Sequence, residues 1–96
     1  MMILVTYDVD FSQQKGAKRL KKVAKLCERY GVRVQNSVFE MLIDPAQLVQ
    51  FKSDLSNLID ASVDSIRMYH LGNNWKNKVE TMGVEKGFAQ DEPLLL

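Results

Sequence analysis

Two aspartates near the start of the chain are the residues best suited to metal chemistry. Asp8 and Asp10 close an apolar, β-branched run over residues 1–10, which predicts a buried strand with carboxylates at its C-terminal end. Because side chains alternate along a strand, both carboxylates are expected on one face, where their oxygens could hold Mg²⁺. An acidic pair alone is a weak motif, so the alternative stays open that these acids simply end the strand and begin a solvated loop.

A strongly basic segment follows these aspartates. Between residues 15 and 33, eight basic residues stand against one acid, a net charge of +7, so the rest of the chain carries −6 and the whole chain +1. The basic residues are Lys15, Lys18, Arg19, Lys21, Lys22, Lys25, Arg29 and Arg33. Such a stripe attracts polyanions such as nucleic acid, whereas a solubilising helix face usually mixes both signs of charge. On charge alone, both interpretations stay open.

The other reactive residue types exclude several function classes. Cys27 is the only cysteine, so the chain has neither an internal disulfide nor a cysteine-based metal site, and its position predicts a small buried side chain. His70 is the only histidine; it could act as a general acid or base, but a structural role is favoured. The sequence contains no Gly-rich phosphate loop and no Ser-His-Asp set, which argues against nucleoside triphosphate use and triad hydrolysis.

Size and hydropathy limit the class of protein. Ninety-six residues, 46% of them hydrophobic, fit one globular domain with a modest core. No stretch is long and apolar enough to span a membrane, and the apolar start is too short for a signal peptide. We therefore expect a cytoplasmic protein that has no membrane partner.

Two helices are predicted to support the basic and acidic residues. The first extends from Ser12, a suitable N-cap, to Gly31, a suitable stop. Its apolar positions, which should face the core, are Ala17, Leu20, Val23, Ala24, Cys27 and Tyr30. The second begins where Asp44 can cap and Pro45 can take the first helical position. Its apolar positions are Leu48, Phe51, Leu55, Leu58 and Ile59.

The remaining elements are predicted to be strands. Residues 32–35 and 38–43 flank the polar pair Asn36-Ser37 and indicate a hairpin. Residues 64–71 predict another strand, which ends at a turn over residues 72–74, where Trp75 is expected to pack. Residues 78–82 predict a last short strand, and residues 84–96 an irregular tail.

This order of elements predicts the fold. The sequence β-α-β-β-α-β, plus one short strand, indicates a single α+β domain over residues 1–96 with the ferredoxin-like arrangement, an antiparallel sheet with both helices on one face. The other face then needs a cover, and the core is small, so a homodimer is expected. The short C-terminal strand and the apolar tail could cross to the partner's sheet edge.

Several motifs, found in this order along nearly the whole chain, resemble the CRISPR-associated protein two family. This family is the small subunit of the CRISPR spacer-acquisition machinery, and the motif sequences are most similar to its type I-C branch. The motifs are LVTYDV at 4–9, KRLKKVAK at 18–25, YGVRVQNSVFE at 30–40 and RMYHLG at 67–72.

The resemblance implies site residues. It makes Asp8 the catalytic residue and Mg²⁺ ligand of a metal-dependent endonuclease, with Mn²⁺ as an alternative ion. It also implies that Arg19 and Arg33 join the lysines of the basic segment as nucleic-acid contacts, for which we select Lys18, Lys22 and Lys25. Supporting candidates are Tyr7, Asp10 and Phe39, although an aromatic at the last position is more often a core residue.

The resemblance also implies partners. Members of the family form ferredoxin-like homodimers with an exchanged last strand and cut single-stranded RNA or double-stranded DNA. In the acquisition complex the dimer bridges two dimers of the CRISPR-associated protein one integrase and lies along the captured DNA.

Two further functions stay open on the sequence. One is a non-catalytic scaffold that holds DNA and recruits the integrase, with Asp8 structural or vestigial. The other is a toxin-like ribonuclease of the same fold that acts without any integrase. The basic helix supports the endonuclease and the scaffold equally, and only the acidic strand end favours the endonuclease.

Overall fold

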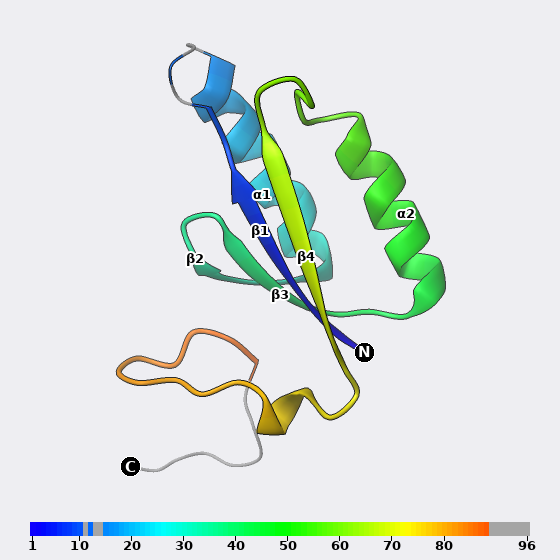
Figure 1. Ribbon diagram of the computed structural model, residues 1–96, viewed down its shortest axis with the longest axis vertical. Helices are drawn as coiled ribbons and strands as arrows, with labels where there is room; N and C mark the ends of the chain where they lie inside the picture. The colour runs from blue at the N-terminus through cyan, green and yellow to red at the C-terminus, as the bar shows by residue number, and fades with distance from the viewer. Residues whose placement is uncertain (11, 13–14, 89–96) are drawn as a thin grey trace.

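The protein folds into an antiparallel sheet with two helices packed on one of its faces (Figure 1). The computed structural model describes residues 1–10, 12 and 15–88. The elements are β1 (Met2–Asp8), α1 (Lys15–Tyr30), β2 (Gly31–Gln35), β3 (Val38–Leu42), α2 (Pro45–Ser56), β4 (Ser65–Gly72) and a 3₁₀ turn, η1 (Trp75–Asn77). The strand order is β2-β3-β1-β4 and every pair is antiparallel. This topology confirms the predicted ferredoxin-like α+β fold.

The core lies between the sheet and the helices. β1 contributes Ile3, Val5 and Tyr7, each at most 2% exposed, because alternate side chains of a strand point to the same face. Their buried neighbours from the other elements include Leu20, Val23, Ala24, Leu26, Cys27, Phe39, Met41, Phe51 and Leu55. The predicted burial of the first strand is therefore confirmed, and so is the buried position of Cys27.

The other face of the sheet carries no α-helix in the part of the chain that the structure describes, and residues 78–80 line a pocket on it. Strand alternation and ladder register place there Leu4, Thr6, Asp8, Val38, Glu40, Arg67 and Tyr69. We call this set the second face. Tyr69 is 43% exposed, so a large aromatic side chain lies partly in solvent on it.

Helix α1 differs from its prediction at one apolar position. Gly16 and Leu26 are buried, whereas Ala17, expected in the core, is exposed. With 3.6 residues per turn, a helix advances by about 100° per residue. Gly16 lies at the centre of the buried stripe of α1, so Ala17 lies just beyond the edge of that stripe. The predicted cap, Ser12, lies next to positions 13–14, which are outside the described residues, and α1 is described from Lys15 onward.

Helix α2 begins as its sequence predicts. The backbone N–H of Gln47 donates to Asp44 Oδ1 at 2.7 Å, and the Asp44 N–H donates to Gln47 Oε1 at 3.0 Å, forming a capping box before Pro45. Phe51 and Leu55 of its apolar stripe are buried. None of the helices in the described residues has the length and apolar character needed to cross a bilayer.

Gly31 joins α1 to β2 without an intervening loop. A Cβ at this position would lie 1.9 Å from the Glu40 backbone oxygen on β3, so only glycine lets the two strands approach here. The chain then makes the predicted hairpin through residues 36–37 into β3. The stop predicted at Gly31 is confirmed, and its physical reason is this close backbone approach.

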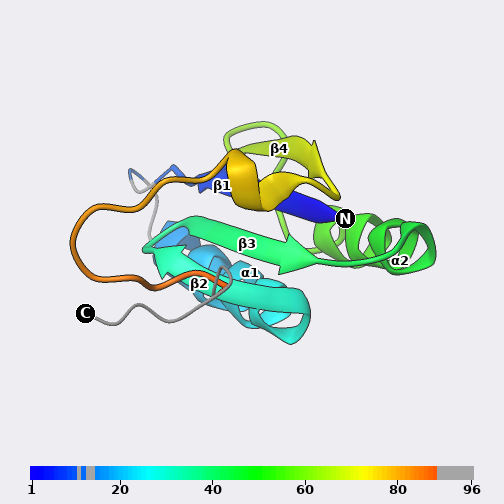
Figure 2. The same cartoon turned by 90° about the horizontal axis from the view of Figure 1, so that it is seen from below.

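The segment after η1 includes residues 78–82, whose predicted strand has no partner among the described residues of the single chain and whose exchange with a second chain stays a prediction. These residues form no strand in the single chain, and the segment runs irregularly back along the sheet (Figure 2). Residues 79–82 and 84–87 line a groove of about 510 Å³ with Val34, Gln35 and Glu40, and the Phe88 N–H donates to Glu40 Oε1 at 3.2 Å. A strand requires a hydrogen-bonded neighbour, and here no strand edge is paired with it. The rest of the predicted tail, residues 89–96, lies outside the described residues.

The capping box generates a prediction about stability. Replacing Asp44 by Ala leaves N–H groups of the first turn of α2 without a partner, so we expect the free energy of unfolding to fall by about 1 kcal/mol. The matched control is Asp54→Ala on the same helix, where only a surface contact with Gln50 at 2.8 Å is lost. Urea unfolding should show a loss below about 0.5 kcal/mol for the control. Equal losses in the two variants would contradict the assigned cap.

Candidate functional site

Asp8 lies at the end of the central strand. It is the last residue of β1, pairs with Ser65 of β4 and is exposed on the second face. Among the described residues, no side chain forms a hydrogen bond with its carboxylate. Asp8 therefore presents an acceptor-only group to solvent from a rigid position in the backbone.

Asp10 does not share that environment. β1 ends at Asp8, and the Asp10 carboxylate accepts a hydrogen bond from the Ser12 N–H at 2.8 Å. The hydrogen bonds from Ser12 hold the pKa of Asp10 below its ordinary value. The expectation that both carboxylates lie on one strand face is therefore wrong for Asp10, which belongs to a turn after the strand, as the loop alternative predicted.

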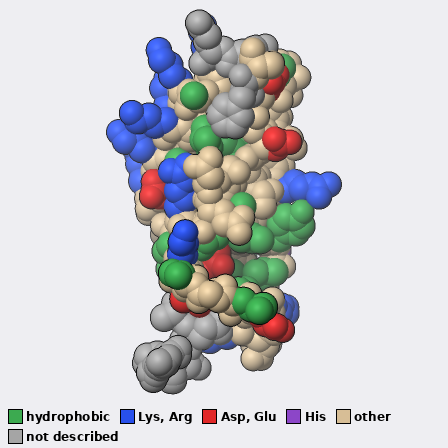
Figure 3. Space-filling model, turned by 90° about the vertical axis from the view of Figure 1, so that its left-hand side faces the viewer, with side chains coloured by type: hydrophobic (Ala, Val, Ile, Leu, Met, Phe, Trp, Pro, Cys, Tyr) green, Lys and Arg blue, Asp and Glu red, His purple; other side chains and the backbone are tan. Residues whose placement is uncertain are grey.

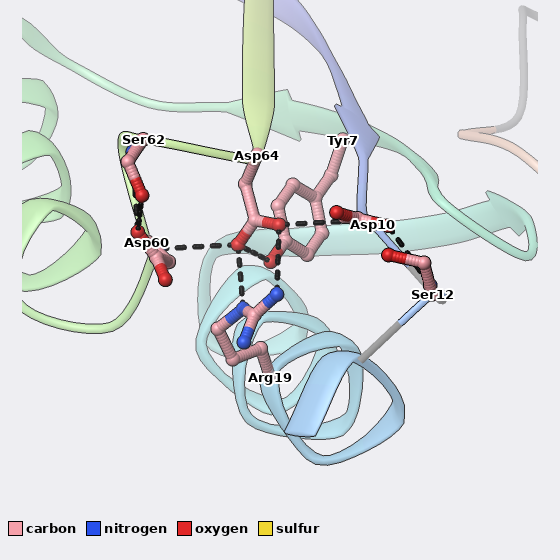
Figure 4. A network of polar contacts seen from close by, with 7 residues as sticks. All are labelled: Tyr7, Asp10, Ser12, Arg19, Asp60, Ser62 and Asp64. Carbon is pink, nitrogen blue, oxygen red and sulfur yellow. Dashed lines mark hydrogen bonds and ion pairs between the residues drawn. The ribbon is translucent and has the colours of Figure 1, made fainter. Parts of the chain in front are cut away.

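A buried carboxylate lies directly behind this strand end. The Asp64 side chain is 0% exposed and accepts hydrogen bonds from the Tyr7 hydroxyl at 2.6 Å and the Asp10 N–H at 3.2 Å (Figure 4). Arg19 of α1 donates to the same carboxylate through Nε at 2.7 Å and Nη2 at 3.1 Å. The Asp60 N–H, from the loop before β4, donates at 3.1 Å. One carboxylate thus joins β1, α1 and that loop.

The electrostatics of this network favour its ionised form. Burial alone would raise the pKa of Asp64, but the hydrogen bonds from Arg19 and Tyr7 outweigh it and hold that pKa well below its usual range. Burial, and then the hydrogen bond to Asp64, raises the pKa of Tyr7 to about 12. Asp64 and Arg19 are therefore charged and Tyr7 is neutral across the physiological range, so this tyrosine is a poor general acid.

Arg19 does not lie on the outer face of α1 with the lysines. Its side chain is 12% exposed and forms a two-bond pair with Asp64, whereas Lys18, Lys22 and Lys25 are exposed. About 100° of helical rotation separates Arg19 from Lys18 and turns it toward the buried side. Its role as a nucleic-acid contact stays a prediction, but the structure gives its guanidinium an internal partner.

The exposed lysines form a basic surface along α1. We define the basic surface as Lys15, Lys18, Lys21, Lys22, Lys25 and Arg29, all exposed. Figure 3 shows Lys and Arg side chains projecting along one edge of the molecule. Lys22, Lys25 and Arg29 also line a groove that reaches Asn57 and Leu58, past the end of α2. Like charges gathered on one helix create a positive potential that suits phosphates.

Phe39 lies on the core face of the sheet, opposite to the face of Asp8, and Arg33 contacts its ring. Phe39 is 0% exposed, which confirms the core alternative, and it has no free face on which a base could stack. The Arg33 guanidinium lies 5.7 Å from the Phe39 ring centroid and donates to the backbone oxygen and Oδ1 of Asn36 at 2.8 and 3.1 Å. These contacts hold the hairpin turn.

Three minor candidates also have clear positions. Burial raises the pKa of the Cys27 thiol to about 12, which makes it a poor nucleophile. Trp75 is 7% exposed, and its ring centroid lies 6.5 Å from that of Phe88, so the predicted packing is confirmed. His70 is exposed near the end of β4, far along the strand from the Asp8–Ser65 pair.

Sequence reasoning missed Asp64, which it counted only as the first residue of a strand. The available signal was Arg19, because an arginine on the buried side of a helix requires an acidic partner. The position of Arg19 in the sequence did not identify which acidic residue is that partner. Asp60 was not singled out either; its carboxylate accepts from the Ser62 N–H at 3.1 Å and Oγ–H at 2.6 Å and shapes the loop before β4.

The donor set of this strand end fits one mode of metal binding. Within the described residues, no group of three or more His, Cys, Asp or Glu side chains could hold a metal ion. Proteins commonly bind Mg²⁺ through one or two carboxylates together with substrate phosphates and water. Asp8 therefore fits a shared site completed by substrate or by a second chain, and does not fit a closed protein cage.

The Tyr7–Asp64 hydrogen bond generates a pH prediction. The pKa of Tyr7 rises from 10.0 to about 12 on folding, so its stabilising effect is complete below pH 10 and is lost as the pH rises toward 12. Tyr7→Phe should lower the free energy of unfolding near neutral pH by about 1.5–3 kcal/mol. It should also remove part of the decline in stability between about pH 10 and about pH 12.

Urea unfolding across this pH range measures both effects. The matched control is Tyr69→Phe, which removes a hydroxyl from a residue that is 43% exposed. This control should keep the alkaline decline of the unmodified chain. An identical alkaline decline in the Tyr7→Phe variant would contradict the role given to the buried hydrogen bond.

Comparison with known proteins agrees with this fold and these motifs. The family model described as CRISPR associated protein Cas2 matches residues 1–79. The "CRISPR-associated endonuclease Cas2" of Halalkalibacterium halodurans is 52% identical over 95 residues, covering 99% of both chains. The "CRISPR-associated endoribonuclease Cas2" of Chlorobaculum tepidum is 49% identical over 96 residues, covering 100% of both.

A solved structure gives the same result. The crystal structure of Streptococcus pyogenes Cas2 matches with a TM-score of 0.79 and 57% identity, covering 86% of this chain and 100% of that chain. The structural neighbour therefore agrees with the βαββαβ topology. The chain belongs to the CRISPR-associated Cas2 family.

Proposed function

We propose that this chain is a Mg²⁺-dependent endonuclease that cuts phosphodiester bonds of DNA or RNA, with Asp8 as its catalytic carboxylate and metal ligand. The observation that carries the proposal is the position of Asp8, exposed at the end of the central strand with no partner among the described side chains. Relatives named as an endonuclease and as an endoribonuclease support the reaction class. Both double-stranded DNA and single-stranded RNA are proposed substrates.

The chemistry divides between the carboxylate and the basic surface. Asp8 would hold the ion through its oxygens, and bound Mg²⁺, or Mn²⁺, would polarise a phosphate and lower the pKa of an attacking water. Lys18, Lys22 and Lys25 would hold phosphates of the backbone without reading bases. Lysine ammonium groups suit this task because they act as mobile point charges.

A homodimer is part of the proposal. Asp8 lies on the same face as the partly exposed Tyr69, so pairing of two second faces could bring one carboxylate from each chain to a shared ion. The second face has no α-helical cover in the described residues, and the segment after η1 lies only against its Leu4, Glu40 and Tyr69 side. An exchange of residues 78–82 with the partner's sheet edge is proposed as well, since this segment has no strand partner in the single chain.

Membership of the Cas2 family supports a place in CRISPR spacer acquisition. There the dimer would bridge the CRISPR-associated protein one integrase and lie along the captured DNA. The basic surface provides the charge that such a contact requires, because binding to a duplex backbone depends on neutralising phosphates.

A non-catalytic scaffold is the second candidate. The observation that favours it is the small donor set, since no metal-holding group of three or more His, Cys, Asp or Glu side chains lies within the described ranges. In addition, Tyr7 is buried and hydrogen-bonded, so it cannot serve as a general base beside Asp8. In this alternative the basic surface alone carries the function and Asp8 is structural or vestigial.

Replacing Asp8 tests the catalytic proposal. Asp8→Asn keeps the shape of the side chain and removes its charge, so cleavage of both substrates should fall to background while dimerisation and nucleic-acid binding persist. Asp10→Asn is the matched control and should reduce cleavage less, because its carboxylate already accepts from Ser12. Mg²⁺ or Mn²⁺ should support activity, and Ca²⁺, which is larger and looser in geometry, should support it poorly.

The same variant separates the two candidates. A nuclease required for acquisition loses both cleavage and spacer acquisition in the Asp8→Asn chain. A scaffold keeps acquisition, and a dispensable nuclease loses only cleavage. Undiminished cleavage by the purified variant would remove Asp8 from the site.

The basic surface is tested by charge reversal. Changing Lys18, Lys22 and Lys25 to Glu should weaken binding to duplexes of any sequence, and the unmodified chain should lose affinity with salt by a slope of about −0.9 per phosphate contact. The control is the double variant Lys52→Glu, Lys86→Glu, which reverses two exposed lysines outside α1. Fluorescence anisotropy at several salt concentrations measures both. Equal binding by the triple variant and the unmodified chain would exclude this surface.

A further inference from the structure

We infer that Asp64 is a positioning residue that holds the catalytic end of β1 in place. This inference rests on the proposed function, because it assigns Asp64 a role in presenting Asp8. The feature behind it is the convergence of five donors on one carboxylate. Its side chain is 0% exposed and accepts from Tyr7, Asp10, Asp60 and, through two nitrogens, Arg19 (Figure 4).

The contacts enclose Asp8 on both sides. Tyr7, the residue before it, is held through its hydroxyl at 2.6 Å, and Asp10, two residues after it, through its backbone N–H at 3.2 Å. The ladder to β4 ends at the pair Asp8–Ser65, so beyond this point the sheet gives the chain no further support. Asp64 supplies the next fixed point, and its own neighbour in sequence is Ser65.

This arrangement matters because Asp8 has no other restraint on its side chain. None of the described side chains holds its carboxylate, so its position depends on the backbone of residues 7–10. A catalytic group must keep a narrow range of positions, and a displacement of about 1 Å can reduce the rate about 100-fold. By holding the backbone on both sides of Asp8, Asp64 therefore restricts the position of its carboxylate, a task that direct hydrogen bonds perform for other catalytic carboxylates.

The same geometry changes the role of Arg19. Its guanidinium binds Asp64 in the two-bond fork that suits a carboxylate, and its side chain is 12% exposed. Arg19 thus acts on cleavage by holding Asp64, and not by contacting a phosphate. A purely structural role for the pair would affect stability alone, with no separate effect on turnover.

The test uses the full-length chain with Asp64→Asn, which keeps the shape of the side chain and removes the charge that Arg19 pairs with. We expect kcat to fall between about 10-fold and about 100-fold while KM and nucleic-acid affinity change less than about twofold. The matched control is Asp54→Asn on α2, outside the network, whose carboxylate accepts only from Gln50 among the described residues. The control should keep kcat.

A second measurement does not depend on activity. Amide hydrogen exchange of residues 8–10 should be faster in Asp64→Asn, since one uncharged amide oxygen replaces the two carboxylate oxygens that hold the Tyr7 hydroxyl and the Asp10 N–H. Exchange should be unchanged in Asp54→Asn. Should Asp64→Asn unfold, Arg19→Lys provides the test, because it keeps the charge and loses the fork. That variant should show the same faster exchange and a lower kcat, with an unchanged salt dependence of binding.

The outcomes are distinct. Unchanged exchange at residues 8–10 in a folded Asp64→Asn chain would overturn the inference. An unchanged kcat in a chain whose Asp8→Asn variant is inactive would also overturn it, as would a salt slope lowered by Arg19→Lys without a change in exchange. Full cleavage by Asp8→Asn would defeat the proposed function instead, and exchange alone would then decide whether Asp64 holds this segment.

Discussion

Hydrogen bonding of β1 on both edges is the constraint on which the rest of the structure depends. β3 fixes the register of β1 on one side and β4 on the other, so β1 as a whole cannot slip without breaking two ladders. A shift by one residue would turn Asp8 into the core and Val5 out of it. The exposed carboxylate at the strand end is thus a consequence of the same pairing that buries the apolar residues.

The two charged regions of the molecule have opposite relations to solvent. On α1, the exposed lysines stay hydrated and face outward, where salt screens them. Behind the end of β1, Arg19 and Asp64 are withdrawn from solvent, so their attraction is stronger and geometry matters more. A buried pair is a poor source of net stability, because desolvation opposes the Coulomb attraction, but it specifies one arrangement of the segments it joins.

Local signals in the sequence predicted the elements well. The alternation of β1, the Asp44-Pro45 helix start and the hairpin through Asn36-Ser37 each depend on neighbouring residues, and the structure confirms them. The failures involve distant partners. Residues 78–82 form no strand in the single chain, because a strand needs the edge of another strand to pair with. Ala17 is exposed because it lies just beyond the edge of the buried stripe of α1. Asp64 could not be identified, because its partners in β1, α1 and the turn after β1 lie 45 to 57 residues away in sequence.

Those long separations have a consequence for synthesis of the chain. β1 is made first, but its neighbours β3 and β4 follow only at residues 38–42 and 65–72. At about 5–20 residues per second on the ribosome, the strand waits roughly 3–12 seconds for its last neighbour. During that time the growing chain already carries the +7 segment, while the carboxylate that anchors the strand end has not been made. The nascent protein therefore gains its attraction for polyanions before it gains an ordered acidic centre.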